Sequence, residues 1–511
     1  MKKGKVEGRE ILFALAGILL FSLATHLWGT GSIPQGAYCD EASIGYDAWS
    51  ILQTGADHHG SRLPVFFQSF GEYKYPLYIY ATIPSVALFG LNEFSTRLPA
   101  ALFGVLAVLA IFLLGRELFD GRVGLLSALF LSISPWAFQF SRIAFEASAL
   151  PAILMLGAWL FVKGTRAKEG YALYAGIALF ALSLYAYGSA RLFAPLFLFA
   201  LAIIFHAELL KRPRKALLAG AIGLVVALPF IYTLVASPDI VFARYNVVSV
   251  FASGHKGFSE FAANLPKYYD YNFLFVQGDR NLRHLPSGTG ELPLFLAPLA
   301  ILGLEAVAYA LLTWKKPREH LALLAWFALF AVPAALTWEG TPHSLRAITG
   351  IGVFELVGAL GAVAFYDIVK RHASRKALAL LVLAAFIIIG LSAAAQLDLY
   401  FNKYPLQGAA WWESGLPASF GYVSGHQAGY DAVFISPKID RAYMYALFYL
   451  QVPPAQYQKA GLGKIYICDP PNCPRASSAL YLVRAGAVPN PDAVFTSLNP
   501  DGTRAFEVRR A

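Results

Sequence analysis

The hydrophobic pattern of the chain consists of long apolar runs separated by short polar segments. Runs of about twenty residues recur along roughly the first four hundred positions. A helix needs roughly 20 consecutive apolar residues to cross about 30 Å of hydrocarbon. The pattern therefore predicts a polytopic α-helical membrane protein with about eleven spans. These spans are expected at 11–29, 98–115, 123–139, 147–162, 171–189, 192–209, 217–235, 291–313, 321–337, 347–366 and 377–396.

One shorter apolar stretch, 75–90, contains two prolines. Its length does not decide whether it crosses the membrane, so the distribution of basic residues is used as a second criterion. If it does not cross and the N-terminus is cytoplasmic, the inside connections hold 20 Lys and Arg in 49 residues, and the outside connections hold 11 in 143. Cytoplasmic connections of membrane proteins carry an excess of Lys and Arg, and a crossing by 75–90 would reverse this excess in the later connections. We therefore expect 75–90 to lie at the outer interface as an amphipathic or re-entrant helix.

The composition agrees with a membrane protein and narrows the possible partners. Hydrophobic residues make up 57% of the 511 positions and charged residues 14%, whereas soluble chains carry about 25% charged residues. The basic cytoplasmic connections explain the net charge of +10, which therefore gives no support for nucleic-acid binding. The apolar run 11–28 is too long for a signal peptide and lacks a small-residue cleavage site, so it is read as the first span. Three cysteines exclude a disulfide scaffold; Cys468 and Cys473 could form a bridge on an oxidising side, and two free thiols are equally compatible with the pattern.

The predicted topology leaves three large segments outside the cytoplasm: loops 30–97 and 236–290, and the chain from about Asp398 onward. After this point short strand-like runs replace the long apolar ones, a pattern typical of a small α/β domain. The sequence thus predicts a membrane domain over 1–397 and an extracytoplasmic domain over 398–511. The strands are expected at Ala432–Ser436, Lys464–Cys468, Leu480–Val483 and Ala493–Ser497, and a helix at Ala442–Leu450.

The first outside loop contains charged residues that membrane insertion does not explain. Asp40 and Glu41 open a stretch with helical periodicity. They could cap this helix, but a cap needs only one carboxylate. Glu72, Tyr73 and Lys74 directly precede the interfacial stretch, where the lysine could also reach lipid phosphate.

Later outside connections add further cations, acids and histidines. They contain Arg142, Glu146, Arg191, Asp279, His284, His343 and Arg346. Taken singly, each has an ordinary explanation as a local ion pair or as part of an exposed polar loop. The informative feature is that all of them are predicted on one side of the membrane.

Cations beside carboxylates at a lipid–water boundary suit an amphiphile with an anionic head. A sugar linked to a polyprenyl phosphate is such a molecule, because its chain dissolves in the bilayer and its phosphate pairs with Arg and Lys. A carboxylate could take the proton of an acceptor hydroxyl while the cations stabilise the departing phosphate.

A divalent metal is the alternative explanation for the histidines. His58, His59, His284 and His343 lie in predicted outside loops, and Glu72 offers a possible oxygen ligand. No H-x-x-x-H or C-x-x-C spacing supports such a site. Glu72 and His284 are therefore kept as weak candidates for metal binding.

Four segments resemble a known family of membrane enzymes. They are YCDEASIGYDAWSIL from Tyr38, SFGEYKYPLYIY from Ser69, LNEFSTRLPAALFGVL from Leu91 and SPWAFQFSRIAFEASALP from Ser134. In this order they resemble the C-type (GT-C) glycosyltransferases of the superfamily that contains the protein O-mannosyltransferases and the lipid A aminoarabinose transferases. The resemblance covers roughly residues 8–400. It implies a GT-C fold with interfacial helices in the first outside loop.

The resemblance also implies roles for residues at matching positions. The catalytic aspartate of the family falls on Asp40, with Glu41 beside it. The lysine–proline element that precedes the interfacial helix resembles the segment from Lys74 to Pro76. An arginine and an acid after the third span resemble Arg142 and Glu146.

The sequence departs from the family pattern at two of these positions. Aminoarabinose transferases place a metal-binding glutamate directly before the lysine, where this chain has Tyr73, with Glu72 one place further out. Glu146 stands where better-known branches have an aspartate. No segment resembles the β-trefoil insertion of eukaryotic mannosyltransferases, so specificity for a protein acceptor is not implied.

We therefore expect an integral glycosyltransferase of the cytoplasmic membrane, with its N-terminus inside and its active site and C-terminal domain outside. It would transfer a sugar from a polyprenyl-phosphate carrier to a lipid, glycan or protein acceptor, with inversion at the anomeric carbon. Asp40, Glu41 and Glu146 are the expected catalytic residues. The expected donor-binding residues are Lys74, Arg142, Arg191, Arg346, Tyr73, Asp279 and His284.

Two other classes of protein remain as alternatives. A transporter or flippase for a lipid-linked precursor usually shows internal repeats and broken helices near the membrane midplane, and the sequence shows no repeat. A non-catalytic membrane scaffold would leave the charges on the outer side unexplained. The sequence indicates neither the sugar and its acceptor nor the oligomeric state.

Overall fold

The computed structural model describes residues 2–486 and 490–511 and divides into two compact units. Unit 1 consists of Met1–His26, Ala101–Ser141 and Glu146–Leu397, and unit 2 consists of Leu27–Ala100, Arg142–Phe145 and Asp398–Ala511. Residues 1 and 487–489, which belong to the predicted domains 1–397 and 398–511, lie outside the described residues. The first outside loop and the C-terminal segment thus share one compact unit. The division of the chain into domains at 397 remains a prediction.

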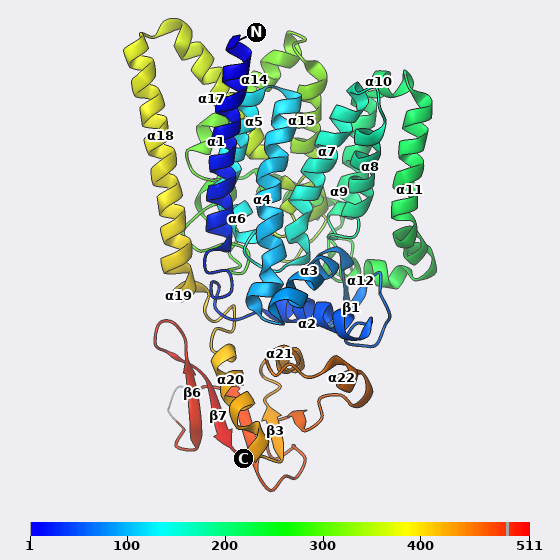
Figure 1. Cartoon of the computed structure of the whole chain (residues 1–511), viewed down its shortest axis with the longest axis vertical. Helices are drawn as coiled ribbons and strands as arrows, with labels where there is room; N and C mark the ends of the chain where they lie inside the picture. Colours follow the sequence, from blue (N-terminus) through cyan, green and yellow to red (C-terminus); the bar gives the residue numbers. More distant parts are fainter. Residues whose placement is uncertain (1, 487–489) are drawn as a thin grey trace. The chain divides into compact units, whose positions relative to one another are not determined.

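Unit 1 is built almost entirely of long helices, which Figure 1 shows lying side by side. Every predicted span overlaps a helix. The corresponding helices are α1 (Lys2–Leu27), α4 (Glu93–Leu118), α5 (Gly121–Ser132), α6 (Pro135–Phe140), α7 (Leu150–Arg166), α8 (Tyr171–Ser183), α9 (Ala190–Ile204), α11 (Pro213–Ala236), α14 (Leu296–Leu312), α15 (Pro317–Leu329), α16 (Val332–Ala335), α17 (Val353–His372) and α18 (Arg375–Asp398).

Among the described residues, seven helical segments are long and apolar enough to cross a membrane. They are Gly8–Leu27, Glu93–Leu118, Glu146–Arg166, Pro213–Ala236, Pro317–Ala335, Ile348–His372 and Arg375–Gly408. Four other predicted spans correspond to the shorter apolar helices α5, α8, α9 and α14. The polytopic membrane class is confirmed, while the number of eleven spans stays a prediction.

Local sequence explains how helices of unit 1 begin and approach each other. Asp120 caps α5, because its carboxylate accepts the backbone N–H groups of Arg122 and Val123. Gly303 of α14 and Gly361 of α17 meet the facing backbone so closely that a Cβ atom at either position would collide with it. Small residues at such crossings let two membrane helices pack tightly.

The second outside loop also belongs to unit 1. It contains α12 (Pro238–Val248), α13 (Phe258–Asn264) and two short helical turns, Leu265–Tyr269 and Asn272–Val276. The remaining short helix of the unit, α10 (His206–Leu210), precedes α11. This loop supplies one of the two polar clusters described below.

Unit 2 places two helices and a hairpin of the first loop together. Helix α2 (Cys39–Thr54) packs against α3 (Pro76–Phe89), and strands β1 (Phe67–Ser69) and β2 (Glu72–Lys74) lie between them in the chain. The predicted helical stretch after Asp40 and the interfacial stretch 75–90 are thus both helical. The position of α3 at the membrane surface remains a prediction.

The β1–β2 hairpin fixes the direction of Lys74. Phe70 and Gly71 form its two-residue turn, and both have positive φ angles, of 56° and 81°, as a type I′ turn requires. The antiparallel register then pairs Phe67 with Lys74. Both residues are buried, because directly paired residues point to the same face of a hairpin.

The C-terminal segment forms a five-stranded mixed sheet in the order β4-β3-β5-β7-β6. Strand β3 runs parallel to β4 and β5, and β7 runs antiparallel to β5 and β6. The strands are β3 (Ala432–Ile435), β4 (Ile465–Ile467), β5 (Ala479–Arg484), β6 (Ala493–Leu498) and β7 (Arg504–Arg510), and the accompanying helices are α19 (Tyr404–Gly408), α20 (Leu416–His426), α21 (Ala442–Tyr449) and α22 (Pro454–Ala460).

The predicted small α/β domain is therefore confirmed, including its four strands and the helix at 442–450. Strand β7 was not predicted. Cys468 and Cys473 form a disulfide with their Cα atoms 5.4 Å apart, which resolves the alternative that the spacing left open. The third cysteine, Cys39, is a buried free thiol.

Candidate active site

Asp40 and Lys74 form an ion pair at the start of α2. Lys74 Nζ donates a hydrogen bond to Asp40 Oδ1 over 2.5 Å. The Asp40 side chain is 40% exposed, whereas that of Lys74 is 9% exposed. The Phe70 ring of the hairpin turn lies 4.9 Å from the same Nζ atom. The lysine thus orients a carboxylate that a substrate can still reach.

Cys39 precedes Asp40 but is unsuited to nucleophilic chemistry. Burial, reinforced by the charge of Asp40, raises the pKa of the Cys39 thiol to about 12. The sulfur therefore stays protonated near neutral pH, and the thiolate is the reactive form of cysteine. At this end of α2 the carboxylate of Asp40 is the group available for chemistry.

Glu41 has different partners from Asp40. It forms a two-pronged ion pair with Arg97, with Nε–Oε1 and Nη2–Oε2 distances of 2.8 and 2.6 Å. The carboxylate also accepts the backbone N–H groups of Ala144, at 2.8 Å, and of Tyr38, at 3.3 Å. Both charged side chains are at most 1% exposed. Glu41 is therefore the capping carboxylate of α2, which leaves Asp40 free for the pair with Lys74.

Arg97 further connects Glu41 to the segment that precedes α2. Its guanidinium donates to the backbone oxygens of Thr30, Pro34 and Gly36, and it lies 5.6 Å from the Trp412 ring. The bonds to three carbonyls and one carboxylate use the whole donor fork of an arginine. This residue holds the start of α2 in place.

Arg142 is a second buried arginine of unit 2. Its Nη2 donates to the backbone oxygens of Trp28, at 2.7 Å, and Ile33, at 3.3 Å. The guanidinium lies 4.9 Å from the rings of both Tyr400 and Phe401. Arg142 thus connects the same N-terminal segment to the chain that follows α18.

The other predicted cations belong to unit 1. Arg191 donates to the backbone oxygen of Val241 at 2.5 Å and lies over the ring of Phe230. Arg346 is buried and pairs with Glu339, through bonds of 2.7 Å to the backbone oxygen and 2.6 Å to Oε2. Both arginines therefore have partners within the protein, and their binding of a carrier phosphate stays a prediction.

Three predicted residues have less distinctive positions. Glu146 begins the short helix Glu146–Ala149 of unit 1 and is half-buried. Glu72 and Tyr73 are half-buried residues of β2 in unit 2. Their roles in acceptor, metal or donor binding remain predictions.

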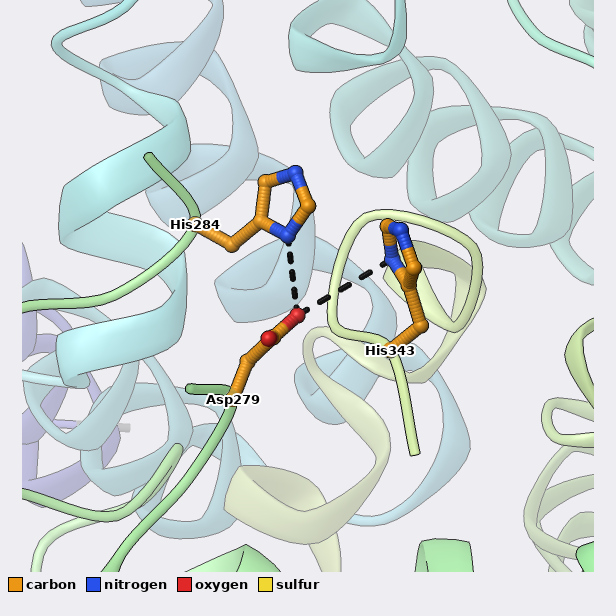
Figure 2. Close-up of side chains that lie close together, drawn as sticks. All are labelled: Asp279, His284 and His343. Carbon is orange, nitrogen blue, oxygen red and sulfur yellow. Dashed lines mark hydrogen bonds and ion pairs between the residues drawn. The ribbon is translucent and has the colours of Figure 1, made fainter. Parts of the chain in front are cut away.

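A second polar cluster lies in unit 1 and consists of Asp279, His284 and His343 (Figure 2). His284 Nδ1 lies 2.9 Å from Asp279 Oδ2, and His343 Nδ1 lies 3.9 Å from the same oxygen. The centroids of the two imidazole rings are 4.5 Å apart. Figure 2 shows both rings turned toward the carboxylate.

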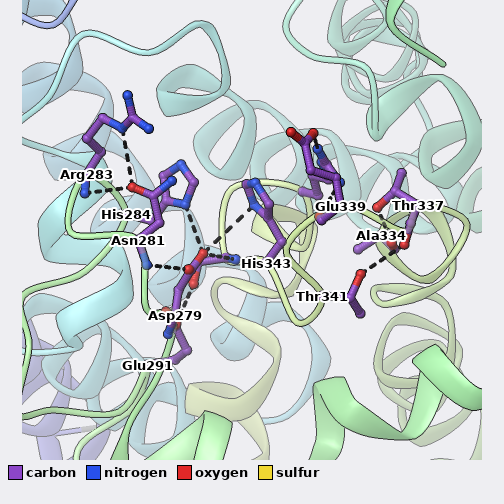
Figure 3. A network of polar contacts seen from close by, with 12 residues as sticks. Asp279, Asn281, Arg283, His284, Glu291, Ala334, Thr337, Glu339, Thr341 and His343 are labelled. Atoms are coloured by element: carbon purple, nitrogen blue, oxygen red, sulfur yellow. Dashed lines mark hydrogen bonds and ion pairs between the residues drawn. The ribbon is translucent and has the colours of Figure 1, made fainter. Parts of the chain in front are cut away.

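Backbone groups fix the orientation of Asp279 in this cluster. The N–H of Asn281 donates to Oδ1 at 2.8 Å, and the N–H of Ser344 donates to Oδ2 at 2.9 Å. Glu291 Oε1 in turn accepts the backbone N–H of Asp279 at 2.9 Å and the hydroxyl of Ser344. Figure 3 shows the network that surrounds Asp279.

The charges in this cluster are set by burial and by close neighbours. Burial opposes ionisation of Asp279, but the charge and hydrogen bond of His284 outweigh it and lower the pKa of Asp279 to about 2. Burial, together with His284 and Arg346, lowers the pKa of His343 far below the ordinary histidine value.

Three pairs of predicted site residues are neighbours in the structure. Asp40 contacts Lys74, Glu41 lies beside Asp40 on the same helix, and Asp279 contacts His284. Sequence reasoning missed Arg97 and Glu291. Arg97 was visible as a charge at the very start of an apolar run, but it was counted only as an outside charge. Glu291 is the first residue of the predicted span 291–313, and nothing in the sequence near it indicates that it contacts Asp279.

Comparisons with known proteins agree with this fold. Residues 74–232 match the family profile described as dolichyl-phosphate-mannose-protein mannosyltransferase. No curated protein matches the sequence. The three solved structures below share 13–18% identity with the chain, and at this level they are evidence for the fold.

Two of these structures are of ArnT from Cupriavidus metallidurans. The apo form matches over 98% of both chains with a TM-score of 0.57 and 13% identity. The form bound to undecaprenyl phosphate matches over 98% of this chain and 97% of its own, with a TM-score of 0.53 and 13% identity. The Archaeoglobus fulgidus oligosaccharyltransferase in complex with Zn and sulfate matches over 89% of this chain and 62% of its own, with a TM-score of 0.53 and 18% identity. The chain thus has the GT-C fold of ArnT over nearly its full length, and its residues 74–232 are similar to the dolichyl-phosphate-mannose-protein mannosyltransferase family.

Proposed function

We propose that this chain transfers a sugar from a polyprenyl-phosphate carrier to a hydroxyl or phosphate of an acceptor on the extracytoplasmic side of the cytoplasmic membrane. The observation that carries the proposal is the pair of a partly exposed Asp40 and a buried Lys74 at 2.5 Å. A carboxylate that can accept a proton beside a cation that can stabilise phosphate is the pair of groups that this transfer requires.

The fold comparison supports a lipid-phosphate donor. The ArnT structure bound to undecaprenyl phosphate has the same fold as this chain over nearly its full length. A donor of this kind also suits the apolar helices, because its isoprenoid chain dissolves in the bilayer. The carrier's chain length, the sugar and the acceptor are not part of the proposal.

The proposed reaction is a single displacement at the anomeric carbon. The carboxylate of Asp40 takes the proton of the acceptor hydroxyl, and the acceptor oxygen forms the new bond to the anomeric carbon. The bond from that carbon to the phosphate oxygen breaks, and the carrier phosphate leaves with the bonding electrons. Lys74 stabilises the charge on the leaving phosphate, because its ammonium group is a cation that donates hydrogen bonds. Attack from the face opposite the leaving group inverts the anomeric configuration.

The remaining charged residues of unit 2 have supporting roles in this proposal. Glu41 and Arg97 fix the start of α2 and thereby the direction of Asp40. Arg142 is held by two backbone oxygens and two aromatic rings, so its charge is positioned in advance for an anionic group.

Substitutions at Asp40 and Lys74 test the proposal in purified protein. In a radiolabelled transfer assay from polyprenyl-phosphate sugars, Asp40→Asn is expected to abolish turnover while carrier-phosphate binding is kept. Lys74→Met removes a charge-assisted contact of about 1.5–3 kcal/mol, so donor use should weaken roughly 10- to 100-fold. Asp440→Asn and Lys459→Met are matched controls at exposed positions of the same unit.

Two outcomes would contradict the proposal. Asp40→Asn with the activity of the unsubstituted chain would remove Asp40 from the reaction. Movement of an intact lipid-linked sugar across a reconstituted bilayer, without transfer to any acceptor, would instead indicate the transporter class.

A further inference from the structure

The Asp279–His284–His343 cluster has features that an ordinary ion pair does not need. A single histidine would satisfy Asp279, which already accepts two backbone N–H groups. The second imidazole, of His343, is nevertheless held within 3.9 Å of the same carboxylate oxygen. Its Nδ1 atom is buried and has no hydrogen-bond partner among the described residues. A buried ring nitrogen without a partner costs free energy unless another group binds it.

The three side chains offer donor atoms in a compact arrangement. One ligand atom from each residue lies within 4.8 Å of the other two. Ligands bound tetrahedrally to Zn²⁺ at about 2.1 Å lie roughly 3.4 Å apart. Shifts of about 1 Å would therefore bring the three donors onto one ion, and the direct hydrogen bond between His284 and Asp279 would be exchanged for two metal bonds.

The ligands come from two segments that are far apart in the sequence. Asp279 and His284 belong to the second outside loop, whereas His343 belongs to the connection before α17. The backbone N–H of Ser344 donates a hydrogen bond to the Asp279 carboxylate, and the Ser344 hydroxyl donates one to the Glu291 carboxylate. The two segments are thus already fixed against each other, as a preformed metal site requires.

We propose that Asp279, His284 and His343 bind one Zn²⁺ ion, which ties the second outside loop to the connection before α17. Two imidazole nitrogens with one carboxylate oxygen form a donor set that suits Zn²⁺, whereas Mg²⁺ and Ca²⁺ prefer oxygen ligands throughout. Three protein ligands leave a fourth tetrahedral position for water. The partial exposure of the His343 side chain, 14%, gives solvent access to that position.

Metal binding can be measured without any sugar donor, so this inference does not depend on the proposed transfer reaction. The full chain, purified in detergent with a tag that contains no histidine and treated with EDTA, is titrated with ZnCl₂ by calorimetry. We expect one equivalent to bind, and MgCl₂ at the same concentrations to give no signal. Co²⁺ in place of Zn²⁺ should give the visible absorption bands of a four-coordinate site.

Three variants assign the binding to the cluster. His343→Asn, His284→Asn and Asp279→Asn should each remove the Zn²⁺ signal and the rise in thermal midpoint that Zn²⁺ causes. His372→Asn, which changes an exposed histidine elsewhere in unit 1, should keep both. His343→Asn is the key variant, because the Nδ1 atom of His343 has no hydrogen bond to lose among the described residues and its loss should leave the zinc-free fold intact.

The inference fails if His343→Asn and His284→Asn bind Zn²⁺ as the unsubstituted chain does, since the ion would then lie elsewhere. It also fails if the unsubstituted chain takes up no Zn²⁺ or binds Mg²⁺ equally well. Loss of transfer activity in Asp40→Asn has no bearing on either result.

Discussion

Asp40 and Glu41 are adjacent in the chain, but their side chains have separate partners. Glu41 is buried and bonded to Arg97 and to two backbone N–H groups, while Asp40 is partly exposed and contacts Lys74. An acid that already uses its oxygens in this way is a poor proton acceptor for a substrate. The two carboxylates therefore have different roles. Glu41 fixes the start of α2, and Asp40 is the carboxylate that we propose as the proton acceptor in the transfer reaction.

The buried pair of Glu41 and Arg97 leads to a prediction about stability. Arg97→Met leaves Glu41 buried without a counter-charge and should lower the free energy of unfolding by about 3–5 kcal/mol. The double variant Glu41→Leu/Arg97→Met should lose less than the two single losses combined, because no unpaired charge remains. Thermal unfolding in detergent, followed by intrinsic fluorescence, measures the effect. Arg62→Met, an exposed arginine of the same loop, is the control; an Arg97→Met variant as stable as this control would contradict the prediction.

At the residue scale the sequence indicated Asp40 and Lys74 as site residues but did not indicate the role of Arg97. Asp40 and Lys74 were predicted from an excess of charge at the outer boundary and from a family resemblance, and the structure pairs them. Arg97 has the same polar character, but its function depends on three carbonyls and a carboxylate contributed by the preceding loop. Such long-range contacts have no signature in the sequence near the arginine.

At the scale of elements, the first loop is joined to the C-terminal segment within unit 2. The side chain of Gln458 in α22 donates to the backbone oxygen of Asp57 at 2.8 Å, and Tyr46 of α2 donates to the backbone oxygen of Val452 at 2.7 Å. Beside these contacts, the buried His58 ring lies 2.6 Å from Asp47 Oδ1 of α2. The Tyr457 ring stacks 6.4 Å from that of His58.

The Asp47–His58 pair predicts a pH dependence of stability. Burial alone would lower the pKa of His58, but the charge and hydrogen bond of Asp47, together with Asp57, outweigh burial and the opposing charge of Lys74 and raise it above 6.5. A raised pKa in the folded state contributes stability that is complete below about pH 6.5 and is lost as the pH rises through the folded-state value.

The thermal midpoint of the unsubstituted chain should therefore fall more steeply as the pH rises above about 6.5 than that of Asp47→Asn, in which His58 lacks its counter-charge. The His59 ring lies 4.0 Å from that of His58, and burial and the charge of His58 lower the pKa of His59, so His59 opposes the trend in the unsubstituted chain. Parallel pH profiles for the two proteins would show that the pair does not couple protonation to folding.

The strands of the C-terminal domain differ in how well the sequence pattern predicts them. The four predicted strands of the C-terminal domain each contain a continuous apolar run. In strand β7 the apolar residues Phe506 and Val508 alternate with the charged residues Glu507 and Arg509. The buried Glu507 forms ion pairs with Arg504 and Arg509. Only the pairing with β5 and β6 makes such a segment an interior strand, and the ion pairs of Glu507 lie within β7 itself.

At the scale of the whole molecule, orientation in the membrane rests on the distribution of basic residues and is supported by the disulfide. Cys468 and Cys473 are bridged, and such bridges persist on the oxidising side of a membrane. We therefore propose that the C-terminal segment lies outside the cytoplasm and, from the basic residues, that the segment around Arg214 lies inside. The apolar helices agree with an integral membrane protein, but their length does not show which end of each helix faces the cytoplasm.

The cysteine content of the chain makes this orientation directly testable. The only free thiol among the described residues, Cys39, is buried, and the other two cysteines are bridged, so the unsubstituted chain should react little with a maleimide that cannot cross membranes. Arg62→Cys and Lys459→Cys, at exposed positions that we expect outside the cytoplasm, should be labelled in intact spheroplasts. Arg214→Cys, exposed in a predicted cytoplasmic connection, should be labelled only after the membrane is permeabilised, because an excess of Lys and Arg holds that connection inside. Labelling of Arg214→Cys before permeabilisation would reverse the orientation and place the Asp40–Lys74 pair on the cytoplasmic side.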